Sequence, residues 1–380
     1  MTRPLSVGIV CFPSLGGSGV VAAAQAVGLA ERGHEVHLVA RSAPPRALPL
    51  PRGLTFHPVE LPPYPLFESP PYTVALASKL IDVAREHRLD LLHVHYAVPH
   101  AVSAYLARQA LGAQAPRVIT SLHGTDVTRV GCDPAYRSAT VFSVAASDGL
   151  VVPSVFLQRE AHRLLGLPEA MPVEVIPNFV DTERFSPAPD PAPPGGAPVL
   201  FHVSNFRAVK RVPDTVEVLA RVRKHLPATL VLVGDGPERR ATDLRARALG
   251  VERWVRFAGR QEDFVGELRR ASAFLVPSES ESFGVAALEA LSAGVPVFGY
   301  RVGGLPELVT PDVGRLVEPL DVDALASAVV EVLGDAPLHA SLRKAGRERA
   351  LAHFRAAPAI DRYESYLRRI LTLTPSRESR

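Results

Sequence analysis

The chain has 380 residues, of which 47% are hydrophobic and 21% charged, so its composition is that of a globular protein with two or three domains. Its net charge of +3, spread along the sequence, gives little support to nucleic-acid binding, and the absence of any run of about 18 uncharged apolar residues excludes a membrane-spanning helix. Two cysteines, Cys11 and Cys132, do not make a disulfide framework.

The N-terminal segment MTRPLSVGIVCF has too short an apolar run before Pro13 to be a signal peptide, and it reads instead as a first strand. Together with the cysteine count, this predicts a cytoplasmic protein.

Short β-branched runs alternate with longer amphipathic runs through the first half of the chain. Strands are expected at 5–12, 35–40, 91–96, 117–122, 149–154 and 173–177. Helices are expected between them, including 20–33, 72–87 and 98–112. Strands that are almost continuously apolar predict a parallel sheet covered by helices on both faces.

A segment rich in Pro, Gly and charge, residues 181–198, interrupts this alternation and reads as a linker. Beyond it, strands are expected at 198–204, 228–234, 254–259, 273–277 and 295–300. Helices are expected at 211–225, 237–249, 262–271, 284–293, 321–334, 337–353 and 358–372.

We therefore predict an α/β protein of two doubly wound, Rossmann-like domains. The first is expected at residues 1–180, with a C-terminal helix at about 356–380 packing back on it, and the second at 181–355. Because such sheets bind ligands at the carboxyl ends of their strands, we expect a ligand cleft between the two domains.

The motif GGSGVVA (16–22) follows the first expected strand and opens a helix. Its glycines let backbone N–H groups approach an anion at the helix N-terminus. Gly17, Gly19 and Ala22 also satisfy the G-x-G-x-x-A dinucleotide fingerprint, and Arg41 after the second strand suits a 2′-phosphate. An NADP-dependent oxidoreductase and a purely structural turn are both open alternatives at this point.

In HVHYAVPH (93–100), His93 and His95 share one face of a strand, a spacing that can chelate zinc. No cysteine or H-E-x-x-H helix accompanies them, and the strand is expected to be buried. Tyr96 is the better ligand candidate, because it lies at the carboxyl end of the strand.

The motif SLHGTDVT (121–128) also lies at the carboxyl end of an expected strand. His123, Thr125 and Asp126 offer donors and acceptors around a glycine turn. A simple Asx or Ser/Thr turn is the alternative.

The second half opens with a motif of its own, SNFRAVKR (204–211). Arg207, Lys210 and Arg211 cluster at this strand-to-helix turn. Cations there would balance the charge that a diphosphate gathers when its bond breaks, and a solvated basic turn is the alternative.

Three glutamates surround a Phe-Gly step in SESESFGVAALEA (278–290). If a helix begins near Ser282, Glu281 lies just before it and Glu289 about two turns inside. Carboxylates so placed can accept hydrogen bonds from hydroxyls at opposite ends of a ligand, while N–H groups near Gly284 face a phosphate. Glu279 then needs no role beyond complementing the positive helix end.

The spacing of Glu281 and Glu289, followed by Gly294-Val-Pro296 and Gly303-Gly304-x-Pro306-Glu307, resembles the retaining GT-B glycosyltransferases. With GGSGVV, PPYTVALASKL, LLHVHYAVPHAVSAYLA, SLHGTDVT and SNFRAVKR added, the chain resembles the N-acetylglucosaminyl L-malate synthases of bacillithiol biosynthesis from about residue 5 to about residue 370.

This resemblance implies transfer of N-acetylglucosamine from UDP-N-acetylglucosamine to L-malate, with retention at the anomeric carbon. It implies no cofactor and no bound metal, because protein cations and helix ends hold the diphosphate. The expected partners are these two small molecules; whether the chain forms a homo-oligomer is left open.

The resemblance also assigns roles to individual residues. Donor-binding residues would be Gly17, Asn205, Arg207, Lys210, Arg260, Gln261, Glu281, Phe283, Gly284, Val285 and Glu289. Acceptor-binding residues would be Ser18, Tyr96, Thr125, Arg129 and Arg137. Candidate catalytic residues are His123, Arg207, Lys210 and Glu281.

Within the donor set, Glu289 would accept from the ribose hydroxyls and Glu281 from the sugar hydroxyls. The Arg260-Gln261 turn would meet uracil. The phosphates would be held by Arg207, Lys210 and the backbone of Phe283 and Gly284. His123 would lie beside the transferred sugar.

Two positions depart from the family pattern. Many relatives carry an arginine five residues before the phosphate lysine, where this chain has Asn205 with Arg207 close by. Malate synthases tend to carry another where this chain has Val141, so we expect Arg137 or Arg129 to turn into the acceptor pocket. A lipid acceptor and a sensor of nucleotide sugars stay open as alternatives.

Overall fold

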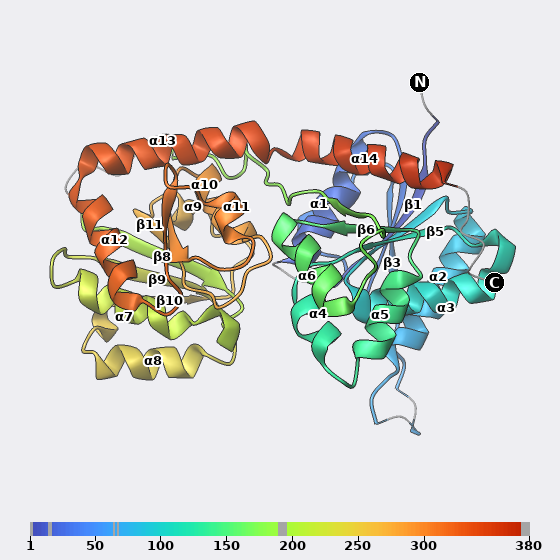
Figure 1. Ribbon diagram of the computed structural model, residues 1–380, viewed down its shortest axis with the longest axis horizontal. Helices are drawn as coiled ribbons and strands as arrows, with labels where there is room; N and C mark the ends of the chain where they lie inside the picture. The colour runs from blue at the N-terminus through green and yellow to red at the C-terminus, as the bar shows by residue number, and fades with distance from the viewer. Residues whose placement is uncertain (1–2, 14–16, 64, 67, 189–195, 374–380) are drawn as a thin grey trace. The chain divides into compact units, whose positions relative to one another are not determined.

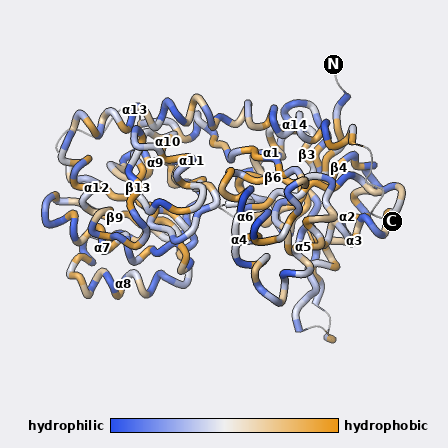
Figure 2. Tube along the Cα trace, viewed as in Figure 1, coloured by the Kyte–Doolittle hydropathy of each residue, from blue (hydrophilic) through white to orange (hydrophobic). Residues whose placement is uncertain are grey.

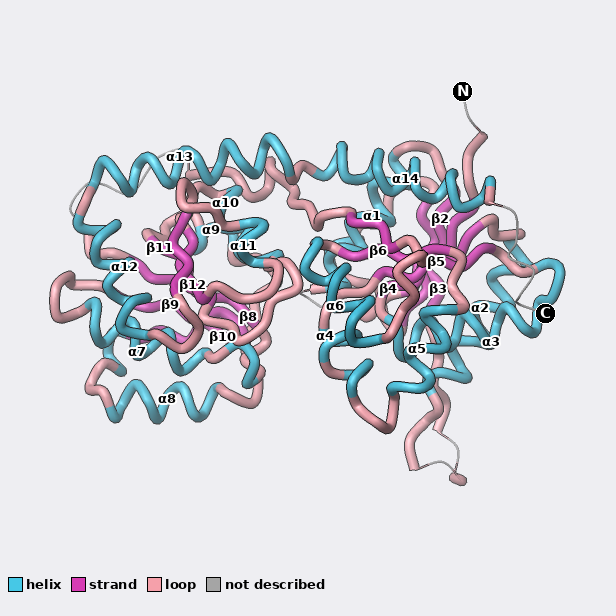
Figure 3. Tube along the Cα trace, in the orientation of Figure 1, coloured by secondary structure: helices cyan, strands magenta, loops and turns pink. Residues whose placement is uncertain are grey.

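The computed structural model describes residues 3–13, 17–63, 65–66, 68–188 and 196–373. It divides the chain into two compact units, Met1–Pro177 with Ala357–Arg380, and Asn178–Ala356. In each unit a parallel sheet is surrounded by helices (Figures 1 and 3).

The first unit contains a seven-stranded sheet in the order β3-β2-β1-β4-β5-β6-β7. Its strands are β1 (Ser6–Val10), β2 (Glu35–Ala40), β3 (Leu54–Pro58), β4 (Leu91–His95), β5 (Arg117–Ser121), β6 (Gly149–Val152) and β7 (Val173–Val175). Its helices are α1 (Ser18–Glu31), α2 (Tyr72–His87), α3 (Val102–Leu111), α4 (Thr125–Thr128), α5 (Arg137–Ala145), α6 (Val155–Leu165) and α14 (Ala356–Thr372).

The C-terminal helix α14 belongs to the first unit although it follows the second in sequence. Its Tyr366 hydroxyl donates to the carbonyl oxygen of Leu150 at 3.1 Å. Gly28 of α1 allows the close approach, because a Cβ atom there would lie 2.8 Å from the side chain of Ile360. A glycine inside a helix costs about 0.5–1 kcal/mol relative to alanine, so its place in α1 reflects this packing.

The second unit contains a six-stranded sheet in the order β10-β9-β8-β11-β12-β13. Its strands are β8 (Val199–Ser204), β9 (Thr229–Gly234), β10 (Val255–Gly259), β11 (Ala273–Val276), β12 (Val297–Tyr300) and β13 (Gly314–Val317). Its helices are α7 (Val212–Val222), α8 (Arg239–Ala248), α9 (Val265–Leu268), α10 (Val285–Ser292), α11 (Leu305–Leu308), α12 (Val322–Gly334) and α13 (Ala336–His353).

Two core clusters lie on the two faces of this second sheet. One packs its strands against α9, α10 and α13, and the other packs them against α7 and α12. Hydrophobic and hydrophilic residues alternate along the outer helices α8 and α13, as expected of helices with one buried stripe (Figure 2).

The expected α/β fold of two Rossmann-like, parallel-sheet units is confirmed. The sequence reading missed two strands, β3 and β13, which are short strands at sheet edges. Most of their residues are partly exposed, so neither shows the continuous apolar run on which the prediction depended. Among the described residues, no helix has both the length and the apolar character needed to cross a bilayer.

Candidate active site

The first six strands of each unit have the same order in their sheets, and the first sheet adds β7 at one side. In both sheets the strand order changes direction beside the first strand of the unit. This reversal falls between β1 and β4 in the first unit and between β8 and β11 in the second. Open α/β sheets bind ligands beyond the carboxyl ends of the strands at such a point. Tyr96, Lys210 and Glu281 follow strands at these points.

In the second unit, Lys210 follows β8 and Glu281 follows the neighbouring strand β11. Lys210 Nζ lies 2.6 Å from Glu281 Oε1, and the hydroxyl of Ser278 donates to the same oxygen at 2.8 Å. Both side chains are partly exposed, 24% for the lysine and 12% for the glutamate. A cation and a carboxylate thus meet at this switch point, where an incoming ligand can reach them.

The loop that carries Glu281 is fixed by the Gly303-Gly304 pair. The amide of Gly304 donates to the carbonyl oxygen of Glu281 at 2.8 Å. Gly303 has a φ of +57°, and a Cβ atom there would lie 1.9 Å from that same oxygen. No residue with a side chain fits at this position without moving the backbone of Glu281.

A second tight contact fixes the loop after β8. Gly234, at the end of β9, has a φ of +119°, and a Cβ atom there would lie 1.8 Å from the carbonyl oxygen of Ser204. Phe206 and Arg211 both adopt positive φ in this loop, at 42° and 48°. Non-glycine residues held in this region cost of order 1–3 kcal/mol and cluster at functional sites, which agrees with the position of Lys210 between them.

Glu279 has a defined partner, which corrects our expectation that it only complements a helix end. Its Oε1 accepts a hydrogen bond from Arg211 at 2.9 Å. Arg211 also pairs with Asp214 at 2.8 Å, and Tyr300 donates its hydroxyl to that same aspartate. These carboxylates hold the pKa of Arg211 above its ordinary value, so Arg211 is committed to structure.

Helix α10 begins at Val285, one residue inside the expected range 284–293 and three residues after Ser282, the start assumed for the spacing of the glutamates. Glu281 therefore lies in the preceding loop, and Glu289 is the fifth residue of the helix, about one turn inside instead of two. The Glu289 side chain is buried, with 4% exposure. Phe283 is also buried and packs edge-on against Phe354, with ring centroids 5.7 Å apart.

Further predicted donor residues of the second unit are exposed or partly buried. Arg207 and Arg260 are exposed, and within the part of the chain that the structure describes their guanidinium groups have no hydrogen-bond or ion-pair partner. Asn205 is exposed, whereas Gln261 and Val285 are partly buried. Arg260 and Gln261 follow β10, which is an edge strand of the sheet.

In the first unit, two predicted acceptor residues meet directly. Tyr96 follows β4 with a φ of 93°, and its hydroxyl lies 2.5 Å from the hydroxyl of Thr125 at the start of α4. Phe12, just beyond β1, packs edge-on against the Tyr96 ring. Ser18 is the first residue of α1, preceded by Gly17 at a φ of +61°, whereas Gly16 falls outside the described residues.

Asp126 organises the loop that carries His123. Its carboxylate accepts hydrogen bonds from the backbone N–H groups of His123 and Gly124, at 3.0 and 2.8 Å, and from that of Ala97 at 3.3 Å. Burial raises the pKa of Asp126 to about 6, while these hydrogen bonds act in the opposite direction. Asp126 therefore has the structural role of an Asx turn. His123 and Thr125 remain candidates for binding a ligand.

A buried chain of hydrogen bonds, which we call the histidine relay, connects Gln25 of α1 with His93, His95 and His123. Gln25 Oε1 lies 2.8 Å from His95 Nε2, and Gln25 Nε2 lies 2.9 Å from His93 Nδ1. His95 Nδ1 lies 3.0 Å from His123 Nε2, and His93 Nε2 lies 2.7 Å from Ser121 Oγ. All four ring nitrogens of His93 and His95 thus have hydrogen-bond partners within the protein. These hydrogen bonds, and not zinc chelation, account for the two histidines.

The relay determines which nitrogen of His123 carries the proton. Burial lowers the pKa of both His93 and His123 to about 3, so the rings are neutral at pH 7. A neutral imidazole has one donor and one acceptor nitrogen. Because the Gln25 carbonyl accepts from His95 Nε2, His95 Nδ1 must accept from His123 Nε2, and Nδ1 of His123 is left as an acceptor.

Sequence reasoning missed Gln25, although its signal was present. It is the one polar residue in the run VVAAAQAV of α1, and it is completely buried. A buried polar side chain inside an otherwise apolar run predicts a hydrogen-bond partner in the core.

Arg137, one of the two alternatives expected to supply a cation for the acceptor, is held by backbone carbonyl groups. Its guanidinium donates to the backbone carbonyl oxygens of Gly131 and Leu164, at 3.1 and 2.6 Å. Val141, where an arginine was expected, packs against a hydrophobic cluster of the first unit. Arg129 is exposed at the end of α4.

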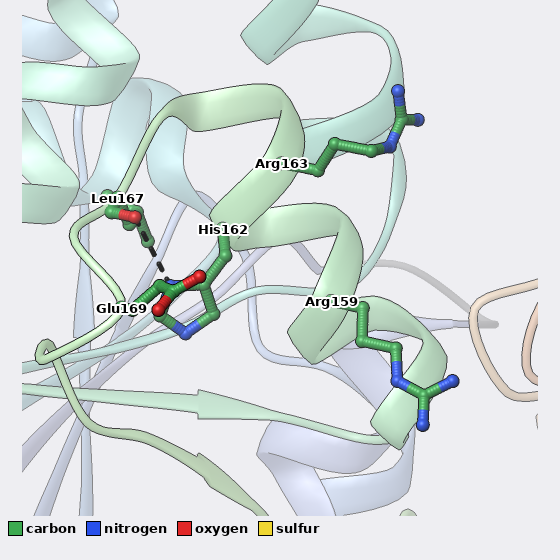
Figure 4. Close-up of a pocket in the computed structure, with 5 residues that line it drawn as sticks. All are labelled: Arg159, His162, Arg163, Leu167 and Glu169. Atoms are coloured by element: carbon green, nitrogen blue, oxygen red, sulfur yellow. Dashed lines mark hydrogen bonds between the residues drawn. The ribbon is translucent and has the colours of Figure 1, made fainter.

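A hollow on the surface of the first unit lies apart from these residues, near the C-terminal end of α6 (Figure 4). Its lining residues are Arg159, His162, Arg163, Leu167 and Glu169. Arg163 is paired with Glu160 on the same helix, at 2.6 Å. None of the predicted site residues lines this hollow.

Comparison with known proteins identifies both halves of the chain. Residues 15–184 match the family model described as Glycosyltransferase Family 4, and residues 187–349 match that described as Glycosyl transferases group 1. The N-acetyl-alpha-D-glucosaminyl L-malate synthase of Bacillus anthracis is 39% identical over 95% of this chain and 96% of its own length. A glycogen synthase of Mycobacterium tuberculosis is 32% identical over 73% of this chain and 68% of its own length.

Solved structures share the fold at lower sequence identity. The sucrose-phosphate synthase of Thermosynechococcus elongatus aligns with a TM-score of 0.82 and 22% identity, over 98% of this chain and 100% of that one. Anabaena HepE in complex with UDP and glucose aligns with a TM-score of 0.79 and 18% identity, over 96% and 99% of the two chains. These likenesses show the GT-B fold and give an oxidoreductase no support. The chain belongs to the GT-B glycosyltransferases that combine a family 4 domain with a group 1 domain.

Proposed function

We propose that this glycosyltransferase moves N-acetylglucosamine from UDP-N-acetylglucosamine to the hydroxyl of L-malate, with retention at the anomeric carbon, as the first step of bacillithiol biosynthesis. The observation that carries this proposal is the 39% identity, over nearly the full length of both chains, with an N-acetyl-alpha-D-glucosaminyl L-malate synthase. The geometry of each unit supports it independently.

The second unit suits a nucleotide-sugar diphosphate. In the reaction, the bond from the anomeric carbon to the diphosphate breaks, and negative charge gathers on the departing phosphate oxygen. Lys210, the exposed Arg207 and the backbone at the start of α10 provide the positive groups that would stabilise this charge. The Lys210 charge is balanced by Glu281 at 2.6 Å.

Lys210 and Glu281, which form one ion pair, would both meet the donor. When the diphosphate binds to Lys210, the carboxylate of Glu281 would exchange its lysine partner for hydroxyls of the sugar. Ser278, which donates to the same Glu281 oxygen, keeps that side chain oriented during the exchange. Glu289, buried in α10, would accept from the ribose hydroxyls.

The first unit offers the donors that a small hydroxy acid requires. A carboxylate of malate would be bound by N–H and O–H groups at the start of α1, with Ser18 among them, and by Tyr96 and Thr125. Arg129 is the remaining candidate cation for the second carboxylate, because Arg137 is bound to backbone carbonyls.

His123 would contribute a hydrogen-bond acceptor to the transferred sugar. The histidine relay leaves Nδ1 without a proton, so a sugar hydroxyl can donate to it, and the low pKa of His123 keeps the ring neutral. As the new bond to the malate oxygen forms, the malate hydroxyl proton would pass to the departing phosphate oxygen.

A panel of acceptors tests the proposal. Purified protein would be incubated with UDP-N-acetylglucosamine and, in separate reactions, L-malate, D-malate, succinate, inositol 3-phosphate or phosphatidylinositol vesicles, and release of UDP would be measured. Inositol 3-phosphate belongs in the panel because a D-inositol 3-phosphate glycosyltransferase of Saccharomonospora viridis is 31% identical over 88% of this chain.

We expect UDP release with L-malate well above that with the other compounds, and an α-linked product by NMR. UDP release with inositol 3-phosphate or vesicles but not with L-malate would overturn the assignment of L-malate as acceptor. It would not affect the assignment of the chain to the glycosyltransferases. A β-linked product would overturn retention.

A further inference from the structure

Three histidines gather in the first unit, on elements other than the strands that the candidate acceptor residues follow. His37 is on β2, His57 is on β3, and His87 is the last residue of α2. Atoms able to bind a metal, one from each ring, all lie within 4.8 Å of one another. In the described part of the chain, no other group of three His, Cys, Asp or Glu side chains is gathered this closely.

The fold explains why these three residues meet. Strands β2 and β3 are parallel, and His37 pairs with Thr55, so His57, two residues further on, presents its side chain on the same face of the sheet. Helix α2 covers that face, because Val39 of β2 belongs to a core cluster shared with α2. The ring of His87, at the end of α2, stacks on that of His37 with centroids 4.0 Å apart.

The atoms of this cluster are close but incompletely bonded. His37 Nδ1 lies 3.0 Å from His57 Nε2. His37 Nε2 is buried, and no described residue forms a hydrogen bond with it, although Oε1 of Glu35 lies 3.2 Å away. The same Glu35 oxygen lies 3.9 Å from His87 Nδ1. A buried nitrogen without a partner is costly, and such groups in native structures often mark an ion or water site.

We propose that His37, His57 and His87 bind one Zn²⁺ ion, with Glu35 completing the site. Three imidazoles and a carboxylate are donors that zinc takes in tetrahedral geometry, with bonds of about 2.0–2.1 Å to nitrogen. Such bonds place ligand atoms about 3.3 Å apart. Glu35 Oε1 already lies 3.2 Å from His37 Nε2, and the ligand atoms of the three rings, which lie within 4.8 Å of one another, would close by up to about 1.5 Å on binding. Glu35 is exposed and His87 ends a helix, so both have room to adjust.

The proposed ion would have a structural role, since it joins two strands to the helix that covers them. The candidate acceptor residues instead follow β1, β4 and β5. The inference therefore stands apart from the proposed transfer reaction, for which no metal is expected.

Metal titration of the full-length protein tests the site. After treatment with a chelator, the protein would be titrated with ZnCl₂ by calorimetry at pH 7.5, and with Co²⁺ followed by visible absorption. We expect one equivalent per chain, a tetrahedral Co²⁺ spectrum and a zinc-dependent rise in unfolding temperature. Loss of a residue that merely supports a ligand costs about 10–100-fold in affinity, so His87→Gln and His57→Gln should each weaken binding at least about tenfold.

His225→Gln is the matched control, because His225 is an exposed histidine of the second unit. Its affinity should equal that of the wild type. Zinc binding that is absent in the wild type, unchanged in both cluster variants, or reduced equally by His225→Gln would overturn the proposal. Circular dichroism in the presence of chelator checks that the cluster variants are folded, and UDP release should be the same with and without chelator.

Discussion

Replacing Lys210 with alanine should reduce turnover far more than it reduces stability. The lysine pairs with Glu281 at 2.6 Å, and the two side chains are 24% and 12% exposed. Exposed pairs contribute about 0–1 kcal/mol, whereas breaking a fully buried pair costs about 3–5 kcal/mol. The remaining hydrogen bond from Ser278 to Glu281 softens the loss, so we expect a cost of about 1 kcal/mol, or about 2–4 °C in the melting temperature of a unit of this size.

The expected effect on catalysis is larger. Removing one preorganised group that stabilises transition-state charge commonly costs about 10²–10³-fold in kcat, which corresponds to about 2.7–4 kcal/mol. Saturation kinetics of UDP release, with UDP-N-acetylglucosamine and L-malate varied in turn, would measure this loss. Thermal unfolding of the same preparation would measure the cost in stability.

Glu279→Gln is the matched control for this experiment. Glu279 also pairs with a cation of the same loop, Arg211 at 2.9 Å, but it is 52% exposed and has no proposed contact with the donor. Its variant should melt and turn over nearly as the wild type does. If Lys210→Ala kept kcat within a few-fold of the control variant, the lysine would be only a structural partner of Glu281, and the proposed role in phosphate binding would be refuted.

Four further outcomes are expected. Glu289→Gln should raise the KM for the nucleotide sugar and leave kcat almost unchanged, because ribose is bound equally in the ground and transition states; a fall in kcat alone would contradict this. Gln25→Leu should cost about 1–3 kcal/mol in denaturant unfolding, because it leaves buried nitrogens of the histidine relay unpaired, and it should also lower kcat. Arg129→Ala should raise the KM for L-malate about tenfold, since a lost charged hydrogen bond costs about 1.5–3 kcal/mol, whereas Arg137→Ala should lower the melting temperature without changing that KM. Stability should fall as pH drops below about 6.5, because His93 and His123, with folded pKa values of about 3, bind protons more tightly in the unfolded chain. Asp126, whose folded pKa is raised to about 6, acts in the opposite direction between about pH 6 and 4. We expect the histidines to dominate, so a melting temperature that rises from pH 7 to pH 5 would refute this prediction.

Much of the fold and part of the site could be predicted from the sequence, because the signals are local. Alternating apolar strands and amphipathic helices are enough to indicate parallel sheets, and the segment at 181–198 marks the change from one pattern to the next. Once the sheets are parallel, residues that follow neighbouring strands must lie at the same edge. Lys210 and Glu281, 71 residues apart, and Tyr96 and Thr125, 29 residues apart, meet for this reason.

The tertiary structure decided the partners of these residues. Arg137 lies one helical turn from Val141, which made it a plausible substitute, but the packing of α6 brings the carbonyl of Leu164 to its guanidinium instead. Gln25 meets His93 and His95 only because α1 crosses the face of β4. His37, His57 and His87 meet because an edge strand with no clear sequence signal pairs with β2 beneath the end of α2. Strand register and the rotation of each helix about its axis fix such contacts, and both depend on packing throughout the core. Hydrophobic periodicity and turn residues, in contrast, can be recognised from a few neighbouring residues of the sequence.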